Sequence, residues 1–562
     1  MLKKALILFL KNKLLVALIL LGSTIWSSTM VRSGLNYSFG LGFWGANGHD
    51  GIWHIALAES LSRGSFDNPV FSGETIKNYH IGFDLLLSLI NKVTNVPINY
   101  LYFQVIPPIL AILIGFLTYK FVLLWRKSKN EAFWATFFVY FSGSFGFLVT
   151  LFRGDGITGE SMFWSSQSIS TLVNPPFALS LILILSGLIS LQKKKLLLSI
   201  LFFGVLIQIK AYAAVLVLSG LFVVSLYEFF MVHRSLFIKV FFGSLLLNLF
   251  LYSLVKNDSL SVFSWQPFWF LETMMSYSDR LGWEKFYSAM TTYKMGGIWL
   301  KAFLAYGVAL FIFMIGNMGL RIIGLYYYFK ILKNKINIDW LIVFITTILI
   351  IATLVPMFFV QKGTPWNTIQ FFYYYLFFFS ILAGIVANWI AKKFIIIFIA
   401  FAIVCSWVTL QHYLPKMPQA KISSNEIEAL EFLRKLPDGI ILTYPFDSDK
   451  AKQAIAPRPI YLYESTSYVS AFSRKDVYLE DEVNLNIMGY DYKKSRKEVF
   501  DFILNLDSKK GKEFLKINNI KYLYLVKNNS PLSGEYLKLG TGDLNLEKIF
   551  ENKESIIYRY DR

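Results

Sequence analysis

The chain has 562 residues, of which 55% are hydrophobic and only 16% are charged, and its mean hydropathy is +0.50. This balance excludes an ordinary soluble globular protein and is typical of multi-span membrane proteins. The formal net charge is +19, but the basic residues lie mainly in short clusters between apolar runs. Membrane orientation signals have this distribution, so we set a nucleic-acid partner aside.

The apolar runs predict an α-helical polytopic membrane protein. The N-terminal segment MLKKALILFLKNKLLVALILLGSTIW has no small-residue cleavage pattern after it, which favours a retained signal anchor over a cleaved signal. A helix needs about 20 apolar residues to cross a bilayer. About eleven transmembrane helices are predicted, at residues 12–32, 100–124, 131–152, 171–191, 196–209, 212–231, 237–256, 298–320, 339–360, 368–390 and 394–412.

Clusters of basic residues fall at alternate ends of these helices. They are Lys3, Lys4, Lys11 and Lys13, then Arg126–Lys129, Lys193–Lys195, Arg234–Lys239, Lys330–Lys335 and Lys392–Lys393. The positive-inside rule places such clusters in the cytoplasm. The pattern therefore predicts a multi-pass plasma-membrane protein with a cytoplasmic N-terminus and an extracytoplasmic C-terminus. Soluble nucleotide-sugars and ATP are then disfavoured as substrates of the outward loops.

Three predicted outward segments stand out, and the first of them is far longer than a connection needs, which points to function. They cover residues 33–99, 153–170 and 257–297. Within the first of them, residues 51–63 and 81–91 are predicted to form helices that lie along the membrane interface.

The composition changes after Tyr413, where charged residues return throughout. Ser423 followed by Glu426 predicts a capping box at the start of a helix. Strands are predicted in the segments GIILTYP, IKYLYLV and SIIYRY. The chain therefore divides into a transmembrane domain at residues 1–412 and a soluble α/β domain at residues 413–562, which the topology places outside.

The most informative stretch begins GHDGIWHIALAESLSRG and closes with NYHIGFDLLLSLI, between Gly48 and Ile90. It holds three of the five histidines and two acids, which are His49, His54, His80, Asp50 and Asp84. A carboxylate at Asp50 could take a proton from an acceptor hydroxyl and act as a general base. The competing interpretation makes Asp50 the N-cap of a helix, and the two roles are compatible.

The same histidines and acids raise the question of a metal. Imidazole and carboxylate suit several divalent cations, so a divalent cation is the one cofactor that this stretch suggests. The sequence shows no tight ligand spacing, and hydrogen-bonding side chains at a wet interface are the favoured interpretation. Glu59 and Arg63 are predicted to pair along one helix face.

Two lysines could hold a phosphate. Lys362 lies in a short outward turn, VQKGTPWNTIQFF, and could equally be an interfacial lysine that reaches toward headgroups. Lys210 breaks the apolar run at 196–231, where a charge within the membrane is costly and usually functional. Weaker candidates are the outward loop charges Arg153, Asp155, Glu160 and Arg280.

Several functions are disfavoured by missing motifs. The sequence has no P-loop, no HExxH and no GxSxG, which argues against an ATP-driven pump, a zincin and a serine hydrolase. The single cysteine, Cys405, cannot form an intramolecular disulfide.

Taken together, these motifs resemble the GT-C superfamily of polytopic glycosyltransferases. The likeness rests on the first loop, on STLVNPPFALSL, QIKAY and KGTPWNTIQFFYYYLFFFSILAG, and on IEALEFLRKLPDGIILTYP, SYVSAFSRKDVYLED and IKYLYLV in the tail. It is closest to a prokaryotic branch with an outward C-terminal domain. The resemblance implies a sugar donor linked to polyprenyl phosphate, an inverting transfer, and an acid in the first loop as base, at the position of Asp50. It also implies that basic residues in later loops, here Lys362 and Lys210, contact the donor phosphate.

This interpretation predicts a hexosyl- or pentosyltransferase with three kinds of partner. These are a polyprenyl-phosphate-linked sugar, the membrane lipid, and an acceptor that is a glycan, a lipid or a protein. Members of the superfamily often carry two adjacent acids where this chain has His49 and Asp50. The alternatives are a flippase or transporter of lipid-linked glycans and a non-catalytic membrane scaffold.

Overall fold

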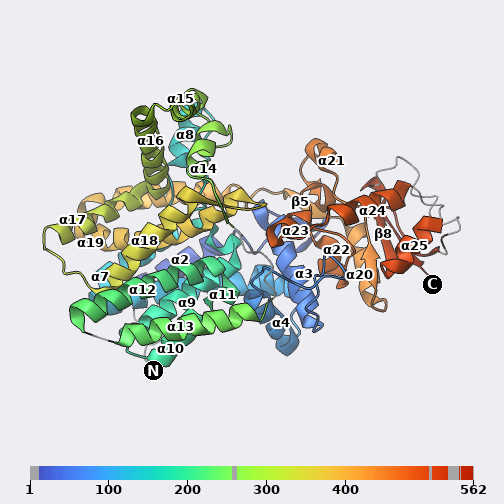
Figure 1. Ribbon diagram of the computed structural model, residues 1–562, viewed down its shortest axis with the longest axis horizontal. Helices are drawn as coiled ribbons and strands as arrows, with labels where there is room; N and C mark the ends of the chain where they lie inside the picture. Colours follow the sequence, from blue (N-terminus) through green and yellow to red (C-terminus); the bar gives the residue numbers. More distant parts are fainter. Residues whose placement is uncertain are drawn as a thin grey trace. The chain divides into compact units, whose positions relative to one another are not determined.

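The computed structural model describes residues 12–233, 235–255, 263–504, 509–529, 544 and 546–560. Helices dominate these residues, and the strands form three small sheets (Figure 1). The chain divides into two compact units. We call Met1–Thr29, Pro107–Leu254 and Leu260–His412 the helical unit, and Met30–Ile106, Val255–Ser259 and Tyr413–Arg562 the mixed unit.

Each of the eleven predicted spans coincides with an apolar helix or helix pair in the described residues. Eight helices are long and apolar enough to cross a membrane: Ile98–Arg126, Pro175–Gln192, Ala211–Val232, Leu236–Ser253, Trp299–Leu332, Trp340–Phe358, Pro365–Ile390 and Lys393–Leu410. The pair α7 (Lys129–Phe141) and α8 (Gly146–Arg153) is bent by 42° and gives a ninth segment. Two shorter apolar segments, Lys13–Ser27 and Leu196–Ile209, complete the set. The polytopic helical fold is confirmed.

The helices of this set have the following bounds: α2 (Lys13–Ser27), α6 (Ile106–Arg126), α9 (Pro175–Gln192), α10 (Leu196–Gly204), α11 (Leu206–Ile209), α12 (Ala211–Val232), α13 (Leu236–Ser253), α16 (Trp299–Met318), α17 (Leu325–Leu332), α18 (Trp340–Phe358) and α19 (Gln370–Leu410). Lys210 separates α11 from α12, at the predicted break in the apolar run 196–231, and α12 is a full-length helix of 22 residues.

The last two predicted spans both lie in α19, and the contacts with α7 show that the chain reverses between them. Trp389 Nε1 donates a hydrogen bond of 3.0 Å to Glu131, near the start of α7. Farther along α19, Phe398 packs on Trp134, and Gln411 Nε2 then donates to the carbonyl of Ile157 at 2.7 Å. The second half of α19 therefore follows the same direction as α7 and α8, and the first half runs opposite to it.

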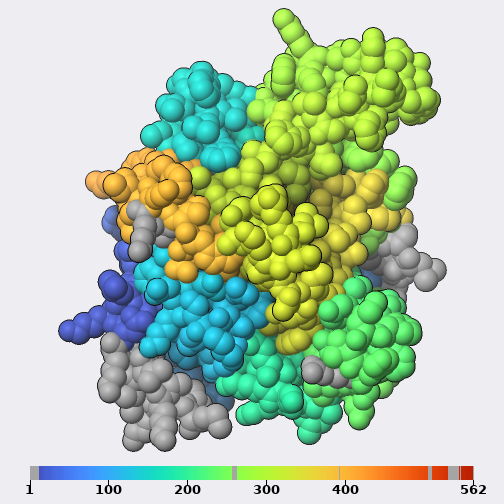
Figure 2. Space-filling model, turned by 90° about the vertical axis from the view of Figure 1, so that its left-hand side faces the viewer, coloured from blue at the N-terminus to red at the C-terminus, as the bar shows by residue number. Residues whose placement is uncertain are grey.

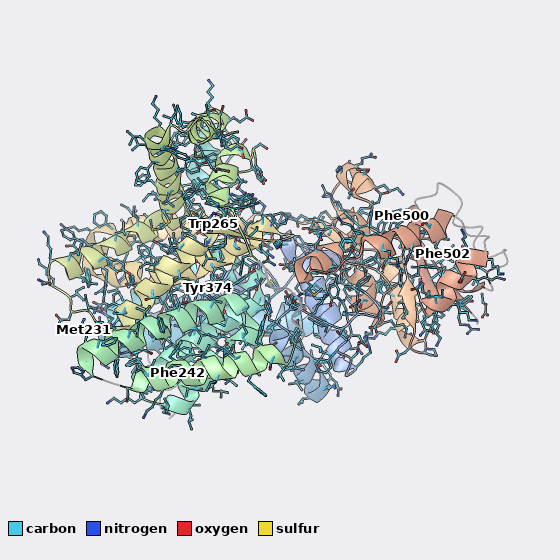
Figure 3. The ribbon with its side chains drawn as sticks, in the orientation of Figure 1. Met231, Phe242, Trp265, Tyr374, Phe500 and Phe502 are labelled. Carbon is cyan, nitrogen blue, oxygen red and sulfur yellow. The ribbon has the colours of Figure 1, made fainter. Side chains whose placement is uncertain are left out.

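Large apolar side chains cover the outside of the helical unit. Met231 is 74% exposed and Phe242 is 54% exposed, and both point outward in Figure 3. Contact of so much apolar surface with water would be unfavourable, whereas contact with lipid removes that cost. The surface therefore fits a membrane-embedded unit.

The predicted basic clusters that the structure describes gather at one end of the helical unit. Arg126 donates to Tyr327 on α17, and Lys330 lies 4.1 Å from the ring centroid of Trp389, near the middle of α19. Figure 2 shows this end, where the yellow α17–α18 segment lies beside the light-blue end of α6. Phe237 packs on Trp340 at this end, so the start of α13, which overlaps the basic cluster Arg234–Lys239, also lies here. Lys3, Lys4, Lys11 and Arg234 lie outside the described residues.

In the mixed unit, the first loop and the C-terminal segment share a sheet. Its order is β1-β2-β5-β7, with bounds Asn36–Tyr37, Gly40–Phe43, Ala420–Ile422 and Arg458–Pro459. Strand β2 pairs antiparallel with β5, with Leu41 opposite Ile422. The first predicted outward loop is thus joined by backbone hydrogen bonds to the segment that follows the last span.

The second sheet of the mixed unit has the order β6-β8-β10-β9. The strands are β6 (Ile440–Leu442), β8 (Ile520–Val526), β10 (Ser555–Tyr560) and β9 (Leu546–Glu551). Strands β6 and β8 are parallel, and the other pairs are antiparallel. All three predicted strands are present, and the capping box of Ser423 and Glu426 begins α20 (Ser424–Lys435).

One hydrophobic core contains residues from both the first loop and the C-terminal segment of the mixed unit. Trp53, Leu57 and Leu61 of α3 (Asp50–Ser62) belong to the same cluster as Leu442 and Leu523. Helices α23 (Glu482–Met488), α24 (Lys493–Leu504) and α25 (Lys509–Ile517) contribute residues to this core. The unit also contains α4 (Gly82–Thr94), α21 (Ser448–Gln453) and α22 (Tyr468–Ser473).

Helix α3 corrects one prediction. Its residues from Gly51 to Leu61 are buried within the protein, so it does not lie along a membrane interface. The predicted pairing of Glu59 with Arg63 is also wrong. Glu59 instead pairs with Arg474, and Arg63 pairs with Asp476 at 2.8 Å, because the C-terminal segment covers this face of α3. Helix α4 keeps an amphipathic surface, with Leu89 52% exposed.

Candidate functional site

The candidate site lies at the first turn of α3, in the mixed unit. Helix α3 begins at Asp50, and His49 is its N-cap residue, with no side-chain capping hydrogen bond. The interpretation of Asp50 as the N-cap is therefore wrong. The side chain of Asp50 is 52% exposed, although the helix that follows is buried. An acid in the first turn also interacts favourably with the helix dipole.

The imidazole of His49 lies between two carboxylates. Its Nδ1 is 3.1 Å from Asp50 Oδ1, and its Nε2 is 3.4 Å from Asp481 Oδ1. Burial lowers the pKa of His49, but the hydrogen bonds with Asp481 and Asp50 outweigh it, so the pKa is raised well above its ordinary value. The raised pKa favours the protonated imidazole, whose Nδ1 lies within hydrogen-bond distance of Asp50 and whose Nε2 faces Asp481 as an ion pair.

Asp481 is a site residue that sequence reasoning missed. It has a left-handed backbone conformation with φ of +51° and is the N-cap of α23. Its Oδ1 accepts from the backbone N–H of Asn484 at 3.1 Å, and its Oδ2 accepts from Asn484 Nδ2 at 2.9 Å. These bonds fix the carboxylate beside His49. The only sequence signal was the acid pair that ends SRKDVYLED.

Glu464 adds a third acid to this neighbourhood. Burial raises the pKa of Glu464, His49 lowers it, and the negative charges of Asp50 and Asp481 raise it again, with a net rise. Sequence reasoning missed this residue too. One imidazolium therefore interacts with three acidic groups that come from two distant parts of the chain.

His54 and Asp84 form a closed pair in the interior. His54 Nδ1 is 2.7 Å from Asp84 Oδ1, and both side chains are buried. Burial raises the pKa of Asp84, and the neighbouring His54 counteracts part of the rise. The pair ties α3 to α4 and positions the start of α3. His80 is half-buried and stacks on Tyr79, with ring centroids 4.7 Å apart.

The donor set does not fit a divalent cation. Among the described residues, no group of three or more His, Cys, Asp or Glu side chains is arranged to hold a metal ion. His49 faces Asp50 and Asp481 through both ring nitrogens, and His54 pairs with Asp84 through Nδ1.

The two predicted phosphate-binding lysines lie at one end of the helical unit. Lys210 is buried, and its Nζ is 3.4 Å from Asn174 Oδ1, at the start of α9. Tyr212, two residues later, donates to Gln361 Oε1 at 2.8 Å. Gln361 ends strand β4 (Phe359–Gln361), and the exposed Lys362 follows it directly. The structure thus brings Lys362 near the α11–α12 break.

The weaker candidates lie in loops of the same unit. Arg280 packs over Trp164 at 4.4 Å, and Arg153 donates to the carbonyl of Arg280 at 2.9 Å. Glu160 is an internal acceptor, since Ser170 Oγ donates to it at 2.5 Å. Asp155 is exposed. Nearby, α14 (Trp269–Ser276) and α15 (Glu284–Met295) follow β3 (Phe263–Trp265), which includes the exposed Trp265 labelled in Figure 3.

Arg321 is a further residue that sequence reasoning missed. It is fully buried, and its guanidinium donates to Ser380 Oγ at 2.8 Å, Gln167 Oε1 at 2.9 Å and Ser168 Oγ at 2.8 Å. The charge is therefore satisfied by neutral acceptors. Arg321 holds the 165–168 segment against the helices, which makes it a positioning residue.

Comparison with known proteins gives structural neighbours only. No family model and no curated protein sequence matches the chain. Among solved structures, the chain is similar to the archaeal oligosaccharyltransferase AglB from Archaeoglobus fulgidus in complex with an inhibitory peptide and a dolichol-phosphate. Its identity is 12%, its TM-score is 0.44, and the match covers 92% of this chain and 70% of that chain.

Two other structures of the Archaeoglobus fulgidus oligosaccharyltransferase match over the same shares of both chains, 92% and 70%, with 11% identity. The apo form has a TM-score of 0.45, and the form tethered to an acceptor peptide with an NVT sequon has a TM-score of 0.41.

Proposed function

We propose that the chain is an integral-membrane glycosyltransferase that moves a sugar from a polyprenyl-phosphate-linked donor to an extracytoplasmic acceptor. The observation that carries the proposal is the environment of Asp50. Its carboxylate is half exposed at the start of a buried helix and is held beside the imidazolium of His49. The other predicted acid of the stretch, Asp84, is enclosed and already paired with His54.

Asp50 is the general base of this reaction. It takes the proton of the acceptor hydroxyl while that oxygen attacks C1 of the donor sugar. The bond between C1 and the phosphate oxygen breaks on the opposite face, so the configuration at C1 inverts. His49 holds the Asp50 carboxylate in position and favours its ionised form, as a base requires.

Lys362 and Lys210 supply positive charge for the lipid phosphate. A polyprenyl donor keeps its tail in the bilayer and its phosphate at the headgroup level. The leaving phosphate gains negative charge as the sugar departs, and a fixed cation stabilises that charge. The exposed side chain of Lys362 suits direct contact, and the buried Lys210 adds a cation behind it. With the basic clusters in the cytoplasm, this end of the helical unit faces outward.

Replacement of the base tests the proposal. Asp50→Asn keeps the size of the side chain and removes its basicity, so transfer from a purified polyprenyl-phosphate sugar should fall by about 10² to 10⁴-fold. The assay uses the full chain in lipid nanodiscs and follows radiolabelled sugar. Asp491→Asn is the matched control, because Asp491 is an exposed acid elsewhere in the mixed unit and should leave the rate unchanged.

Undiminished transfer by Asp50→Asn would end the assignment of the base. The same assay after dialysis against EDTA tests whether transfer needs a divalent cation. We expect transfer to survive this treatment. Loss of transfer in EDTA that Mg²⁺ or Mn²⁺ restores would show that a cation takes part.

A further inference from the structure

The segment that carries Glu464 is anchored on both sides beside the candidate site. On one side, the hydroxyl of Tyr463 donates a hydrogen bond of 3.0 Å to the carbonyl of Gly45, in the turn before α3. On the other side, Ser465 Oγ accepts from the backbone N–H of Glu482 at 2.9 Å, at the first residue of α23. Glu464 is therefore held between the start of α3 and the start of α23.

The charged groups that act on Glu464 are the members of the candidate site. They are His49, Asp50 and Asp481, which come from the two helix starts that flank it. Arg458, earlier in the same segment, acts on the neighbouring tyrosine hydroxyl. Glu464 itself is half-buried, and no described residue donates a hydrogen bond to its carboxylate. Its charge is therefore directed at the site and is not spent on a partner of its own.

A negative charge at Glu464 has a defined effect on each of the two reactive groups. Alone, the protonated His49 would stabilise the Asp50 carboxylate and so weaken it as a base. Glu464 repels the ionised Asp50 and offsets this effect, so that proton uptake from an acceptor hydroxyl becomes more favourable. The same charge stabilises the proton on His49. Glu464 thus keeps His49 charged and Asp50 basic at the same time.

We infer that Glu464 is a positioning residue of the transfer reaction, which acts through His49 and Asp50 and is supplied by the C-terminal segment. The inference rests on the proposed function and adds a residue to its site. It gives the C-terminal segment a part in the reaction, because the first loop alone contains only the base and the imidazole.

The charge of His49 can be measured without any transfer. Histidine labelled with ¹³C at Cε1, in the full chain in nanodiscs, reports the five histidine side chains by NMR, and His49→Gln assigns one signal. In Glu464→Gln, the midpoint of the His49 titration should move to lower pH, because a stabilising negative charge is lost. Glu464→Asp keeps the charge and should restore most of the parent behaviour. Glu513→Gln removes an exposed charge elsewhere in the mixed unit and should leave the titration unchanged.

The pH profile of transfer tests whether Glu464 acts through the base. Protonation of Asp50 should limit the rate at low pH, and loss of the proton from His49 should limit it at high pH. In Glu464→Gln, both limbs should move to lower pH, and the rate at the optimum should fall about threefold to tenfold, as expected for a weaker base. A residue that only supports the fold would lower the rate without moving either limb.

A His49 titration that stays in place in Glu464→Gln would overturn the inference, and so would a moved titration with unmoved limbs. Failure of the proposed function is distinguishable, because the parent chain would then transfer no sugar although its His49 titration still responds to Glu464→Gln. If Glu464→Gln lowers the folded fraction, Glu464→Ala decides, because it removes the same charge and has no amide to bury.

Discussion

At the scale of single residues, the protein places one buried imidazolium among acids. His49 contacts Asp50 and Asp481 directly and interacts with Glu464. The sequence revealed only the first of these neighbours, because Asp50 is adjacent in the chain. Asp481 and Glu464 come from the far end of the chain, and no periodicity or spacing connects them to His49. The candidate base could therefore be chosen from the sequence, whereas the residues that surround it could not.

His49 gives the fold a predicted dependence on pH. Its pKa is raised in the folded state, so its contribution to stability is complete below about pH 6.5, the ordinary value. That contribution is lost as the pH rises through the folded-state pKa. The melting temperature of the parent chain should therefore fall with rising pH across this range, and His49→Gln should flatten that part of the profile.

Thermal unfolding in detergent, followed by intrinsic fluorescence between pH 6 and pH 10, measures this effect on each variant. His233→Asn is the matched control, because His233 is exposed and has a left-handed backbone that asparagine tolerates. The control should keep the parent profile. An unchanged slope in His49→Gln would contradict the role given to the imidazolium.

At the scale of elements, long apolar runs were predictable and short strands were not. The eleven apolar helical segments and the strands β6, β8 and β10 follow from runs of apolar and β-branched residues. Strands β1 and β2 span NYSFGLGF, which has too few residues and too many glycines to show an alternating pattern. The interface position of α3 was predicted wrongly because a helix covered by a distant segment has the same composition as one covered by lipid.

The pairing of β2 with β5 depends on Gly40. Its φ of +107° suits glycine only, and a Cβ at this position would lie 2.0 Å from the carbonyl oxygen of Ile422. Gly40→Ala should therefore destabilise the mixed unit by about 3 kcal/mol or more, through backbone strain and the clash together.

Gly64→Ala isolates the strain from the clash. Gly64 also has a positive φ, +85°, but a Cβ there would meet nothing within 4 Å. This control should cost about 1 to 2 kcal/mol. Thermal unfolding and protease resistance of the C-terminal segment report both variants. Equal losses for the two would show that the β2–β5 contact does not constrain Gly40.

At the scale of the whole molecule, the distribution of charge predicts the orientation. The described basic clusters share one end of the helical unit, which should face the cytoplasm. In a Cys405→Ala background, a cysteine at Asp449 should react with a membrane-impermeant maleimide in intact cells. A cysteine at Lys333 should react only after permeabilisation. Both positions are exposed, so burial does not confuse the comparison. The reverse labelling pattern would invert the topology.

The shared core of the mixed unit also sets the order in which the protein can mature. Trp53 and Leu57 belong to the same core as Leu442 and Leu523. This core therefore cannot form until the C-terminal segment has been synthesised. A nascent chain would export its first loop long before the partner of β2 emerges from the ribosome. In the predicted orientation, that loop would be accessible to chaperones and proteases on the outer side of the membrane until synthesis ends. Co-expression of the missing C-terminal fragment is therefore the natural way to rescue a chain truncated after His412.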